Sequence, residues 1–364
     1  MKKTLYVSPN GYIGGAEKIL IQIASLHFQN ESHVHTLFFN YGLASQQLAS
    51  KKIPHFILKN SFRLSSPIRL LKALREIRKI IKNEKIELIH STMAYGHLVM
   101  SLASFGMNIK RVWFQHGPVN GILDKFASLF PVDAIFFNSE YLLLLHNSSN
   151  KLQFPARKEI IPLGIEKPAH LNPVKSSLLR FALIGRLSPL KGFDRVIKAL
   201  IQLKDKDSLI LNKIKLNIIG ETNYPHEKIY ADKLKILATK LGAVVEFIPF
   251  QNEMSVIYNS NDILVQSSLY GEGFGLVLAE AMSYGLLAVG PSYGGGTQIL
   301  TNKKTGLSFD FAKSSIDELE IFMCDLINNF KTYSDIRENG RKLIAEKYTN
   351  EIMIVKILKI YEQL

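Results

Sequence analysis

Cysteine, acidic residues and long apolar runs are scarce in this sequence of 364 residues. The single cysteine, Cys324, excludes a disulfide framework within one chain, and in the stretch IFMCDLI we expect a buried thiol on an apolar helix face rather than a nucleophile. No run of about 18 apolar residues occurs, so no membrane-spanning helix is expected. The start, MKKTLYVSPNG, is basic but too briefly apolar for a signal peptide. These absences predict a cytoplasmic protein.

The shortage of acidic residues is concentrated in the first half. Residues 1–170 contain 21 Lys and Arg against 10 Asp and Glu, a net charge of +11, whereas residues 171–364 contribute only +3 of the total of +14. This asymmetry favours an anionic partner for the first half. A solvated surface and a compositional bias toward lysine are the alternatives. A nucleic-acid-binding protein is not favoured, because interleaved aromatic or recognition-helix patterns are missing.

Short apolar runs rich in Ile, Val and Phe alternate with helical patterns through both halves. Strands that are buried on both faces are continuously apolar, so the pattern predicts parallel sheets covered by helices on both sides. We expect strands at 4–9, 35–40, 55–58, 87–92, 111–117, 134–140 and 159–165, and then at 180–186, 214–220, 244–250, 262–268 and 286–291.

The pattern restarts after the polar, proline-bearing stretch 165–177. We therefore predict an α/β protein with two doubly wound, Rossmann-like domains that face each other across a cleft. The first domain is expected at 1–168 and the second at 169–349, with a C-terminal helix at about 350–364 packing back on the first. The ligand is expected at the carboxyl ends of the strands.

A glycine-bearing loop, GYIGGAEK (11–18), follows the first predicted strand. Free amides and the helix dipole at such a loop can hold an anion, although a simple turn explains the glycines equally well. The spacing of Gly11, Gly14 and Gly15 differs from G-x-G-x-x-G, and no acidic ribose partner ends the next strand. A dinucleotide-dependent dehydrogenase is therefore not favoured.

Two cations flank one strand end in GRLSPLKG (185–192). Arg186 ends the strand and Lys191 opens the next helix, an arrangement that suits a diphosphate. Exposed loop cations are the alternative interpretation.

Two glutamates mark the stretch YGEGFGLVLAEAMSYG (270–285). Glu272 is expected in a glycine-rich loop and Glu280 inside a helix that runs from about 274 to 283. Eight helical residues turn about 800°, which is about 80° beyond two full turns, so both carboxylates are expected to face one cleft. Carboxylates accept hydrogen bonds from sugar and ribose hydroxyls, and the amides of residues 274–276 can serve a sugar or a phosphate.

Six motifs in order, GGAEK, QHG, GRLSPLKG, EGFGLVLAE, GGGTQI and TGLSFD, resemble the retaining glycosyltransferases of family four (glycosyl transferases group 1), which have the GT-B fold. The resemblance covers nearly the whole chain. It implies that Glu280 holds the nucleotide ribose, that Glu272 contacts the donor sugar, and that Arg186 and Lys191 bind the donor diphosphate. It further implies that His116 faces the sugar and that backbone closes around phosphate and sugar at Gly14, Gly15, Phe274, Gly275 and Leu276.

The implied reaction is transfer of a sugar from a nucleotide-diphosphate donor, most often UDP in this family, to an acceptor hydroxyl with retention of configuration. The implied catalytic residues are Glu272, His116, Arg186 and Lys191, and no cofactor or divalent ion is implied. Three departures from the family pattern, at Gln298, Leu163 and His90, leave a non-catalytic donor-binding or scaffold protein as the alternative. The acidic DKD at 205–207 is expected to form a solvated turn rather than a metal site.

A basic helix is predicted at 67–83, within SSPIRLLKALREIRKIIKNEK (65–85). Its apolar positions form one stripe, which comprises Ile68, Leu71, Leu74, Ile77, Ile80 and Ile81. An ordinary sheet-covering helix explains this stripe. Its remaining surface is rich in Lys and Arg, and the resemblance implies that this half of the chain meets the acceptor. We therefore hypothesise that this face approaches an anionic membrane, that the protein is peripheral on the inner face of a bacterial membrane, and that the acceptor is a cell-envelope polysaccharide or a lipid-linked glycan.

Overall fold

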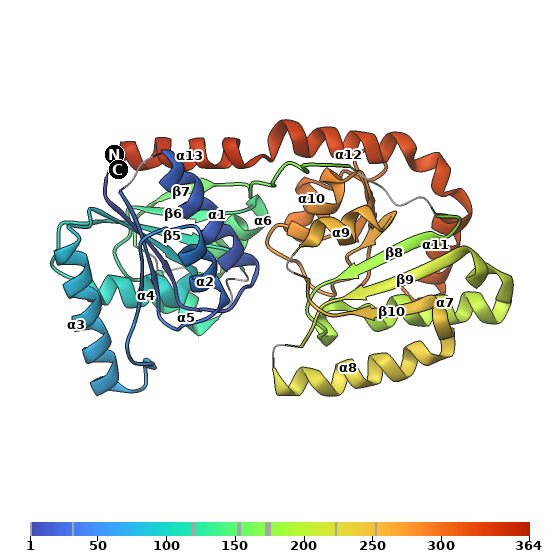
Figure 1. The fold of residues 1–364 in the computed structure, drawn as a ribbon, viewed down its shortest axis with the longest axis horizontal. Coiled ribbons are helices and arrows are strands. Elements are labelled where there is room, and N and C mark those ends of the chain that lie inside the picture. The colour runs from blue at the N-terminus through green and yellow to red at the C-terminus, as the bar shows by residue number, and fades with distance from the viewer. Residues whose placement is uncertain are drawn as a thin grey trace. The chain divides into compact units, whose positions relative to one another are not determined.

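The computed structural model describes residues 2–30, 33–117, 119, 121–150, 154–171, 176–222, 224–251 and 253–364. The chain forms two compact units (Figure 1). Unit 1 comprises Met1–Gly164 and Asn350–Leu364, and unit 2 comprises Ile165–Thr349. Of the polar stretch predicted to join two domains, residues 172–175 lie outside the described residues.

Unit 1 is built on a parallel sheet of seven strands in the order β3-β2-β1-β4-β5-β6-β7. The order reverses beside β1, as in doubly wound α/β folds, where ligands bind at the carboxyl ends of the strands. The strands are β1 (Thr4–Ser8), β2 (Val34–Phe38), β3 (His55–Ile57), β4 (Leu88–Thr92), β5 (Lys110–Gln115), β6 (Ala134–Phe137) and β7 (Arg157–Ile160).

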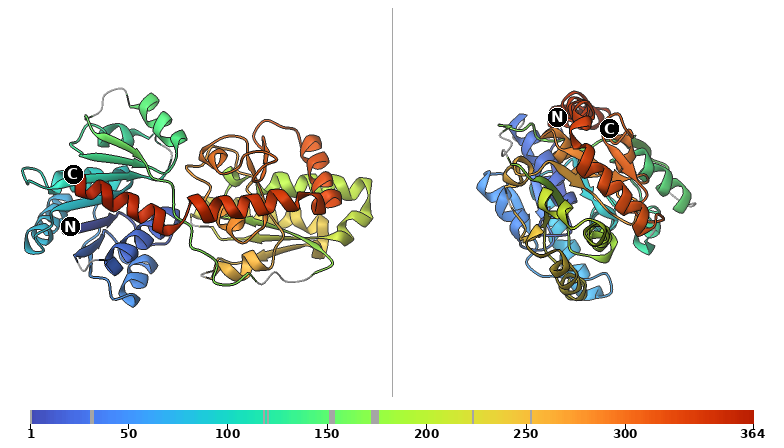
Figure 2. Two further views of the ribbon diagram at one scale, coloured as in Figure 1. Left: turned by 90° about the horizontal axis from the view of Figure 1, so that it is seen from above. Right: turned by 90° about the vertical axis from the view of Figure 1, so that its right-hand side faces the viewer.

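Helices cover both faces of this sheet, because alternate side chains of each strand point to opposite faces. Leu5 and Val7 of β1 pack with α3 and α4, whereas Tyr6 points toward His27 of α1 and Tyr361 of α13. Figure 2 shows α13, in red, lying along unit 1. The helices of this unit are α1 (Gly15–Asn30), α2 (Leu43–Ser50), α3 (Pro67–Asn83), α4 (Met93–Ala103), α5 (Ile122–Ala127), α6 (Glu140–Ser149) and α13 (Asn350–Gln363).

Unit 2 is built on a second parallel sheet, in the order β10-β9-β8-β11-β12-β13. The two parallel sheets confirm the predicted α/β class. Five of the strands were predicted, and β13, a strand of three residues, was not. The strands are β8 (Leu179–Ile184), β9 (Ile214–Ile219), β10 (Val245–Ile248), β11 (Ile263–Val265), β12 (Leu287–Pro291) and β13 (Leu307–Phe309).

The helices of unit 2 bury one core against one face of its sheet, where Phe181 and Leu183 of β8 meet apolar residues of α7, α8 and α11. The α-helices are α7 (Phe193–Lys206), α8 (Pro225–Ala238), α9 (Met254–Asn259), α10 (Leu276–Ser283), α11 (Ile316–Asn329) and α12 (Ser334–Lys347). The 3₁₀ helices are η1 (Pro189–Lys191), η2 (Ser208–Lys213), η3 (Thr239–Val244), η4 (Gly295–Gln298) and η5 (Phe330–Tyr333).

The basic helix is confirmed as α3, but its apolar stripe is buried only in part. Ile77 and Ile81 are buried, whereas Ile68 is 71% and Leu71 is 53% exposed. The N-terminal turns of α3 thus extend beyond the core they were predicted to cover. None of the described helices is long enough and apolar enough to cross a membrane.

Two smaller predictions have mixed outcomes. Cys324 lies on α11 and packs against the core, but its thiol is only partly buried and accepts a hydrogen bond from Asn328 Nδ2 at 3.3 Å. The DKD stretch ends α7, and Asp207 there caps η2 by accepting from the amide of Leu209 at 3.0 Å. Among the described residues, no three His, Cys, Asp or Glu side chains gather as metal ligands do.

Candidate functional site

Most of the predicted site residues of unit 2 lie in two loops at the carboxyl edge of its sheet. One loop follows β8 and carries Arg186 and Lys191, and the other follows β11 and carries Glu272. Because β8 and β11 are parallel neighbours, both loops leave the sheet at the same edge. The amide of Leu269 donates to the carbonyl of Leu190 at 2.8 Å, which joins the loops directly.

Gly192 allows this close approach. Its φ of +64° lies in the left-handed region, and a Cβ there would come within 2.4 Å of the carbonyl oxygen of Ser267. Any other residue would both strain the backbone and push the two loops apart. The glycine that ends the GRLSPLKG motif is therefore needed to hold Lys191 beside the loop after β11.

Lys191 and Glu272 form an ion pair at 2.6 Å between Nζ and Oε1. Both side chains are largely buried, at 17% and 19% exposure. The Glu272 carboxylate also accepts hydrogen bonds from Ser268 Oγ and, at 3.0 Å, from Gln266 Nε2. Three donors thus fix one carboxylate at the sheet edge.

Lys191 keeps its charge. Burial alone would lower the pKa of Lys191, but the adjacent Glu272 carboxylate raises it above its ordinary value. Lys191 is therefore an ammonium group at neutral pH. A buried cation beside a carboxylate that accepts several hydrogen bonds can exchange one anionic partner for another.

Arg186 is held by a different acid. Its Nε donates to Glu227 Oε1 at 2.9 Å, and its guanidinium lies 5.4 Å from the centre of the Tyr224 ring. The Glu227 side chain is only 3% exposed, whereas that of Arg186 is 36% exposed. Because the bond to Glu227 uses Nε, the two terminal nitrogens of Arg186 are not consumed by it.

Glu280 is held by a tyrosine of α9. It lies on α10 and accepts a hydrogen bond from the hydroxyl of Tyr258 at 2.5 Å. Burial raises the pKa of Tyr258 well above its ordinary value, so this phenol stays protonated and donates. α10 begins at Leu276, four residues after Glu272, so the helical angle used to place both glutamates on one face does not apply to Glu272.

The backbone at Phe274, Gly275 and Leu276 forms the start of α10. Phe274 is buried, and Gly275 takes the N-cap position with a φ of +87°. The glycines of GGGTQ support the neighbouring loop, since the amide of Gly295 donates to the carbonyl of Glu272 at 2.7 Å. A Cβ on Gly294 would lie 2.7 Å from the Cα of Gly271.

In unit 1, Gly14 and Gly15 lie at the carboxyl edge of the other sheet, after β1. The amide of Gly14 already donates to Glu17 Oε2 at 3.1 Å, and Glu17 Oε1 accepts from Asn10 at 3.2 Å. Burial raises the pKa of Glu17, against the effect of these hydrogen bonds. Gly15 begins α1, and a Cβ there would meet nothing within 4 Å. The space next to the helix start is therefore open at Gly15, while Glu17 orders the loop.

His116 follows β5 at the same edge of unit 1. Its ring lies 4.0 Å from the ring of Phe114, and its backbone carbonyl accepts from Asn138 Nδ2 at 3.2 Å. Burial lowers the pKa of His116 to about 3, so the imidazole is neutral. Its Nδ1 is buried with no hydrogen-bond partner in the described part of the chain.

The residues that depart from the family pattern make contacts within their own units. His90 lies in the core of unit 1, where its Nδ1 is 2.5 Å from the hydroxyl of Tyr361, and burial lowers its pKa to about 3. Leu163 is buried. Gln298 ends η4, and its carbonyl accepts from the hydroxyl of Tyr348 at 3.5 Å.

Sequence reasoning missed four contributors to the site: Gln266, Ser268, Tyr258 and Glu227. Gln266 and Ser268 belong to the predicted strand DILVQSS, but β11 ends at Val265, so both belong to the loop. Polar residues at the end of an apolar strand were the signal that could have found them. Tyr258 and Glu227 stand on helices distant in sequence, and no motif pointed to them.

Comparison with known families gives the chain two matches. The family described as Glycosyltransferase Family 4 matches residues 13–167, and the family described as Glycosyl transferases group 1 matches residues 172–343. An uncharacterized glycosyltransferase of Haemophilus influenzae is 26% identical over 370 residues, which cover 97% of this chain and 98% of that relative. D-inositol 3-phosphate glycosyltransferase of Actinosynnema mirum is 28% identical over 167 residues, which cover 42% of this chain and 40% of that relative.

Solved structures of the GT-B fold resemble the whole chain. Anabaena Alr3699/HepE in complex with UDP and glucose superposes with a TM-score of 0.86 at 19% identity and covers 100% of both chains. Sucrose-phosphate synthase from Thermosynechococcus elongatus gives a TM-score of 0.81 at 16% identity, covering 99% of this chain and 98% of that one. At these identities the likeness establishes the fold.

Proposed function

Because the chain belongs to glycosyltransferase family 4 and has the GT-B fold, we propose that it moves a sugar from a nucleotide-diphosphate donor to an acceptor hydroxyl with retention of configuration. The observation that carries this proposal is the Lys191–Glu272 pair beside Arg186 at the carboxyl edge of unit 2. The cations Arg186 and Lys191 suit a diphosphate, and the Glu272 carboxylate suits sugar hydroxyls. We propose UDP as the nucleotide, since the similar Anabaena protein is described in complex with UDP.

The donor would exchange contacts that the protein now makes with itself. In this proposal the diphosphate takes Lys191 from Glu272, and the terminal nitrogens of Arg186 add bidentate contacts. Glu272, still held by Gln266 and Ser268, then accepts from donor sugar hydroxyls. Glu280 accepts from the ribose, and the amides of Phe274, Gly275 and Leu276 meet phosphate and sugar. In unit 1, Gly14 and Gly15 are assigned to phosphate and His116 to the sugar.

The chemical step breaks the bond between the anomeric carbon and the diphosphate oxygen. The acceptor oxygen bonds to that carbon on the same face, and its proton passes to the departing diphosphate. Arg186 and Lys191 stabilise the charge that develops on the leaving group. We propose that they do so without a cofactor or divalent ion, so that transfer persists in excess EDTA. Glu272 is bound by three donors in the resting protein, which argues against its acting as a covalent nucleophile.

A panel of nucleotide sugars tests the donor assignment. The full chain is heated with UDP-, GDP- and ADP-sugars, and a specific ligand raises the midpoint of unfolding by mass action. UDP-sugars are expected to raise it most. Equal, negligible shifts across the panel would contradict donor binding.

A non-catalytic donor-binding or scaffold protein is the second candidate, because Gln298 stands where the family often has a glutamate. The two candidates differ in turnover. An enzyme releases free nucleotide from the bound donor, whereas a scaffold raises thermal stability with the donor and releases none.

For the acceptor, we propose a lipid-linked or cell-envelope glycan, met by a peripheral protein on the inner face of the membrane. Support comes from the exposed cations of α3 and from Ile68 and Leu71, which are exposed beside them. A surface that combines apolar side chains with Lys and Arg binds anionic bilayers.

A further inference from the structure

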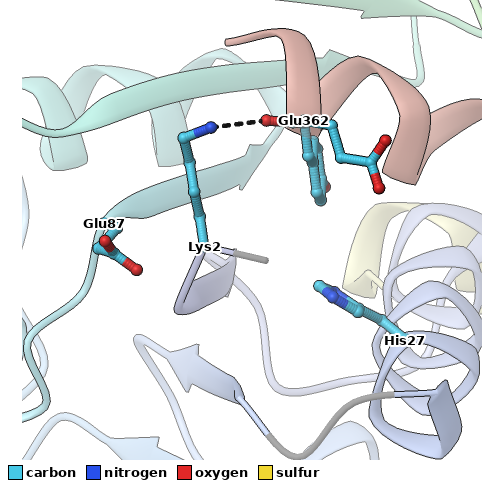
Figure 3. A pocket seen from close by; sticks show the side chains of 5 residues that line it. Lys2, His27, Glu87 and Glu362 are labelled. Atoms are coloured by element: carbon cyan, nitrogen blue, oxygen red, sulfur yellow. Dashed lines mark hydrogen bonds between the residues drawn. The ribbon is translucent and has the colours of Figure 1, made fainter.

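Two cavities in the described part of unit 1 differ in charge and place. The first is about 340 Å³ and is lined by Lys2, His27, Glu87, Tyr361 and Glu362 (Figure 3). Lys2 Nζ already donates to the carbonyl of Tyr361 at 2.9 Å, and two carboxylates line the space. It lies where β1 and β4 begin, at the amino edge of the sheet and away from Gly14 and His116. This cavity therefore does not favour an anionic ligand.

The second cavity lies at the carboxyl edge, between the end of β2 and the start of α3. It is about 400 Å³ and is lined by Asn40, Ser61, Phe62, Arg63, Ser66 and Arg69. No acidic residue lines it. Within the described ranges, no carboxylate pairs with the guanidinium of Arg63 or Arg69, and both side chains are exposed. Two unneutralised guanidinium groups thus flank one hollow.

The start of α3 adds hydrogen-bond donors to the same hollow. Ser66 is the N-cap residue, but its hydroxyl makes no capping bond, and Pro67 follows it. The first amides of a helix have no partner within the helix, and the helix dipole places partial positive charge there. Ser61, Ser66 and two arginines thus line a space with no acidic wall, at the N-terminus of α3.

One wall of the cavity is aromatic and held in place. The ring of Phe62 lies 5.4 Å from that of Phe39 and 6.3 Å from that of Tyr95. These neighbours belong to the core of unit 1, so the wall is firm. A phosphoryl group fills only a small part of about 400 Å³, which leaves room for a sugar ring or the start of a lipid chain against Phe62.

We infer that this cavity binds a phosphoryl group carried by the acceptor. Arginine forks bind phosphate oxygens in pairs, and hydroxyl and amide donors satisfy those that remain. The assignment to the acceptor rests on the proposed function, whereas the binding of a phosphoryl group does not.

The position of the cavity fits this role. Asn40 Nδ2 donates to the carbonyl of Pro9 at 3.2 Å, which links the cavity to the loop that precedes α1. A Cβ on Gly11 would lie 2.3 Å from the carbonyl oxygen of Asn40, so the two loops are in direct contact. The cavity thus borders the glycine loop of the proposed transfer site without including it.

Calorimetric titration of the full chain with glycerol 3-phosphate tests the inference. UDP is kept at a saturating concentration so that it occupies the proposed diphosphate site at Arg186 and Lys191. The double variant Arg63→Gln and Arg69→Gln should weaken binding by about tenfold or more, as expected when charge-assisted hydrogen bonds are lost. The matched control, Lys51→Gln and Lys52→Gln, removes two exposed cations of the same unit and should change affinity by less than about twofold.

The variant Arg63→Lys and Arg69→Lys keeps both charges and should retain part of the affinity, which separates recognition from folding. Dihexanoyl phosphatidic acid, used below its micelle concentration, is the second probe. Tighter binding than glycerol 3-phosphate identifies a lipid phosphate, and equal binding identifies a water-soluble one.

The inference would be overturned if the wild type, the variant with Arg63→Gln and Arg69→Gln, and the variant with Arg63→Lys and Arg69→Lys bound the phosphate with equal affinity. This holds whatever the result with nucleotide sugars. Conversely, failure of every nucleotide sugar to bind would remove the acceptor role and leave the phosphate result standing. If UDP does not bind, glycerol 3-phosphate can also bind at Arg186 and Lys191. That binding is the same in every variant, so it does not affect the difference in affinity between them.

Discussion

Arg186 is held by Glu227 and lies over the ring of Tyr224. Glu227 is buried at the start of α8 and binds Nε of Arg186, and the guanidinium carbon lies over the Tyr224 ring, 5.4 Å from its centre. Such a pairing fixes the direction of the remaining guanidinium nitrogens before a diphosphate arrives. Glu227 is therefore a positioning residue in this account.

Replacing Glu227 by Gln should weaken UDP binding by about three- to tenfold, because Arg186 loses its charged anchor. Calorimetric titration with UDP measures this. The control Glu246→Gln removes an exposed carboxylate that pairs with Lys215 in the same unit and should leave UDP affinity unchanged. In an Arg186→Ala background, Glu227→Gln should have no further effect. If Glu227→Gln weakened UDP binding by the same factor in the Arg186→Ala background, Glu227 would act independently of Arg186.

From the sequence, single candidate residues could be named, but their pairings could not. Lys191 and Glu272 stand in motifs, so the chemistry that each can perform was readable. Their ion pair could not be predicted, because it depends on which loops leave neighbouring strands. β8 and β11 are far apart in the sequence and become neighbours only through the strand order of the sheet. The partners of Glu280 and Arg186 come from α9 and α8, outside any motif, and only the fold brings them together.

At the scale of elements, the continuity of the apolar runs decided which strand predictions held. Continuous apolar runs located the strands of both sheets, because burial on both faces leaves a strong signal. β13 reads Leu-Ser-Phe, so a polar residue interrupts its apolar pattern, whereas the equally short β3 and β11 lie in continuous apolar runs. For α3, periodicity predicted one apolar face, but not that the sheet ends before the first turns of the helix are covered.

α3 should bind anionic vesicles through those first turns and its exposed cations. Substitution of Arg75, Lys79 and Lys82 by Gln should release the protein, since each cation near such a surface contributes about 1 kcal/mol. Arg78 is left unchanged, because it donates to the carbonyls of Ala103 and Phe105 at 3.2 and 2.8 Å. Sedimentation with phosphatidylglycerol and phosphatidylcholine vesicles measures the effect.

Two further arms make that sedimentation decisive. Ile68→Ser with Leu71→Ser should reduce binding without removing charge, and added salt should reduce binding by the wild type. Equal recovery with anionic and neutral vesicles, or indifference to both sets of substitutions, would exclude α3 as a membrane contact.

At the scale of the whole molecule, the first unit carries several buried histidines. Burial lowers the pKa of His90 and of His97 to about 3, and the ring of His97 stacks at 5.1 Å on Trp113. In the unfolded chain both titrate near their ordinary pKa, about 6.5. Protons therefore bind the unfolded state first as the pH falls, and the native state loses stability below about 6.5.

Urea unfolding of the full chain at pH values from about 7 to 5 should show this loss. Each histidine contributes up to about 1.4 kcal/mol per pH unit once the pH is well below 6.5. Trp113 is the single tryptophan, so its fluorescence reports unit 1 alone. In the variant His97→Phe, the slope of the unfolding free energy against pH should decrease by the amount that corresponds to roughly one proton. A free energy of unfolding that stays flat across this range would contradict the account.

The division of the chain into repeated α/β patterns was visible in the sequence, because both halves restart the same alternation. The last helix was expected to pack back on the first domain, and in the structure Asn350–Leu364 belongs to unit 1. Tyr361 of α13 approaches His90, Phe136 and Tyr6, which lie far from it in sequence. Such contacts between distant segments are set by packing and leave no local signal.

Nucleotide release from the donor sugar selected by the panel tests the central claim most directly. Wild type is compared with Lys191→Ala, Glu280→Gln and the control Lys198→Ala, whose side chain pairs with Asp194 on the exposed surface of α7. Loss of a charge-assisted contact to the leaving group should lower kcat/KM by about 100-fold in the first variant, and by about tenfold or more in the second. The control should stay within about twofold of wild type. Unchanged kcat/KM in both site variants, or donor binding by the wild type with no nucleotide released, would contradict the account.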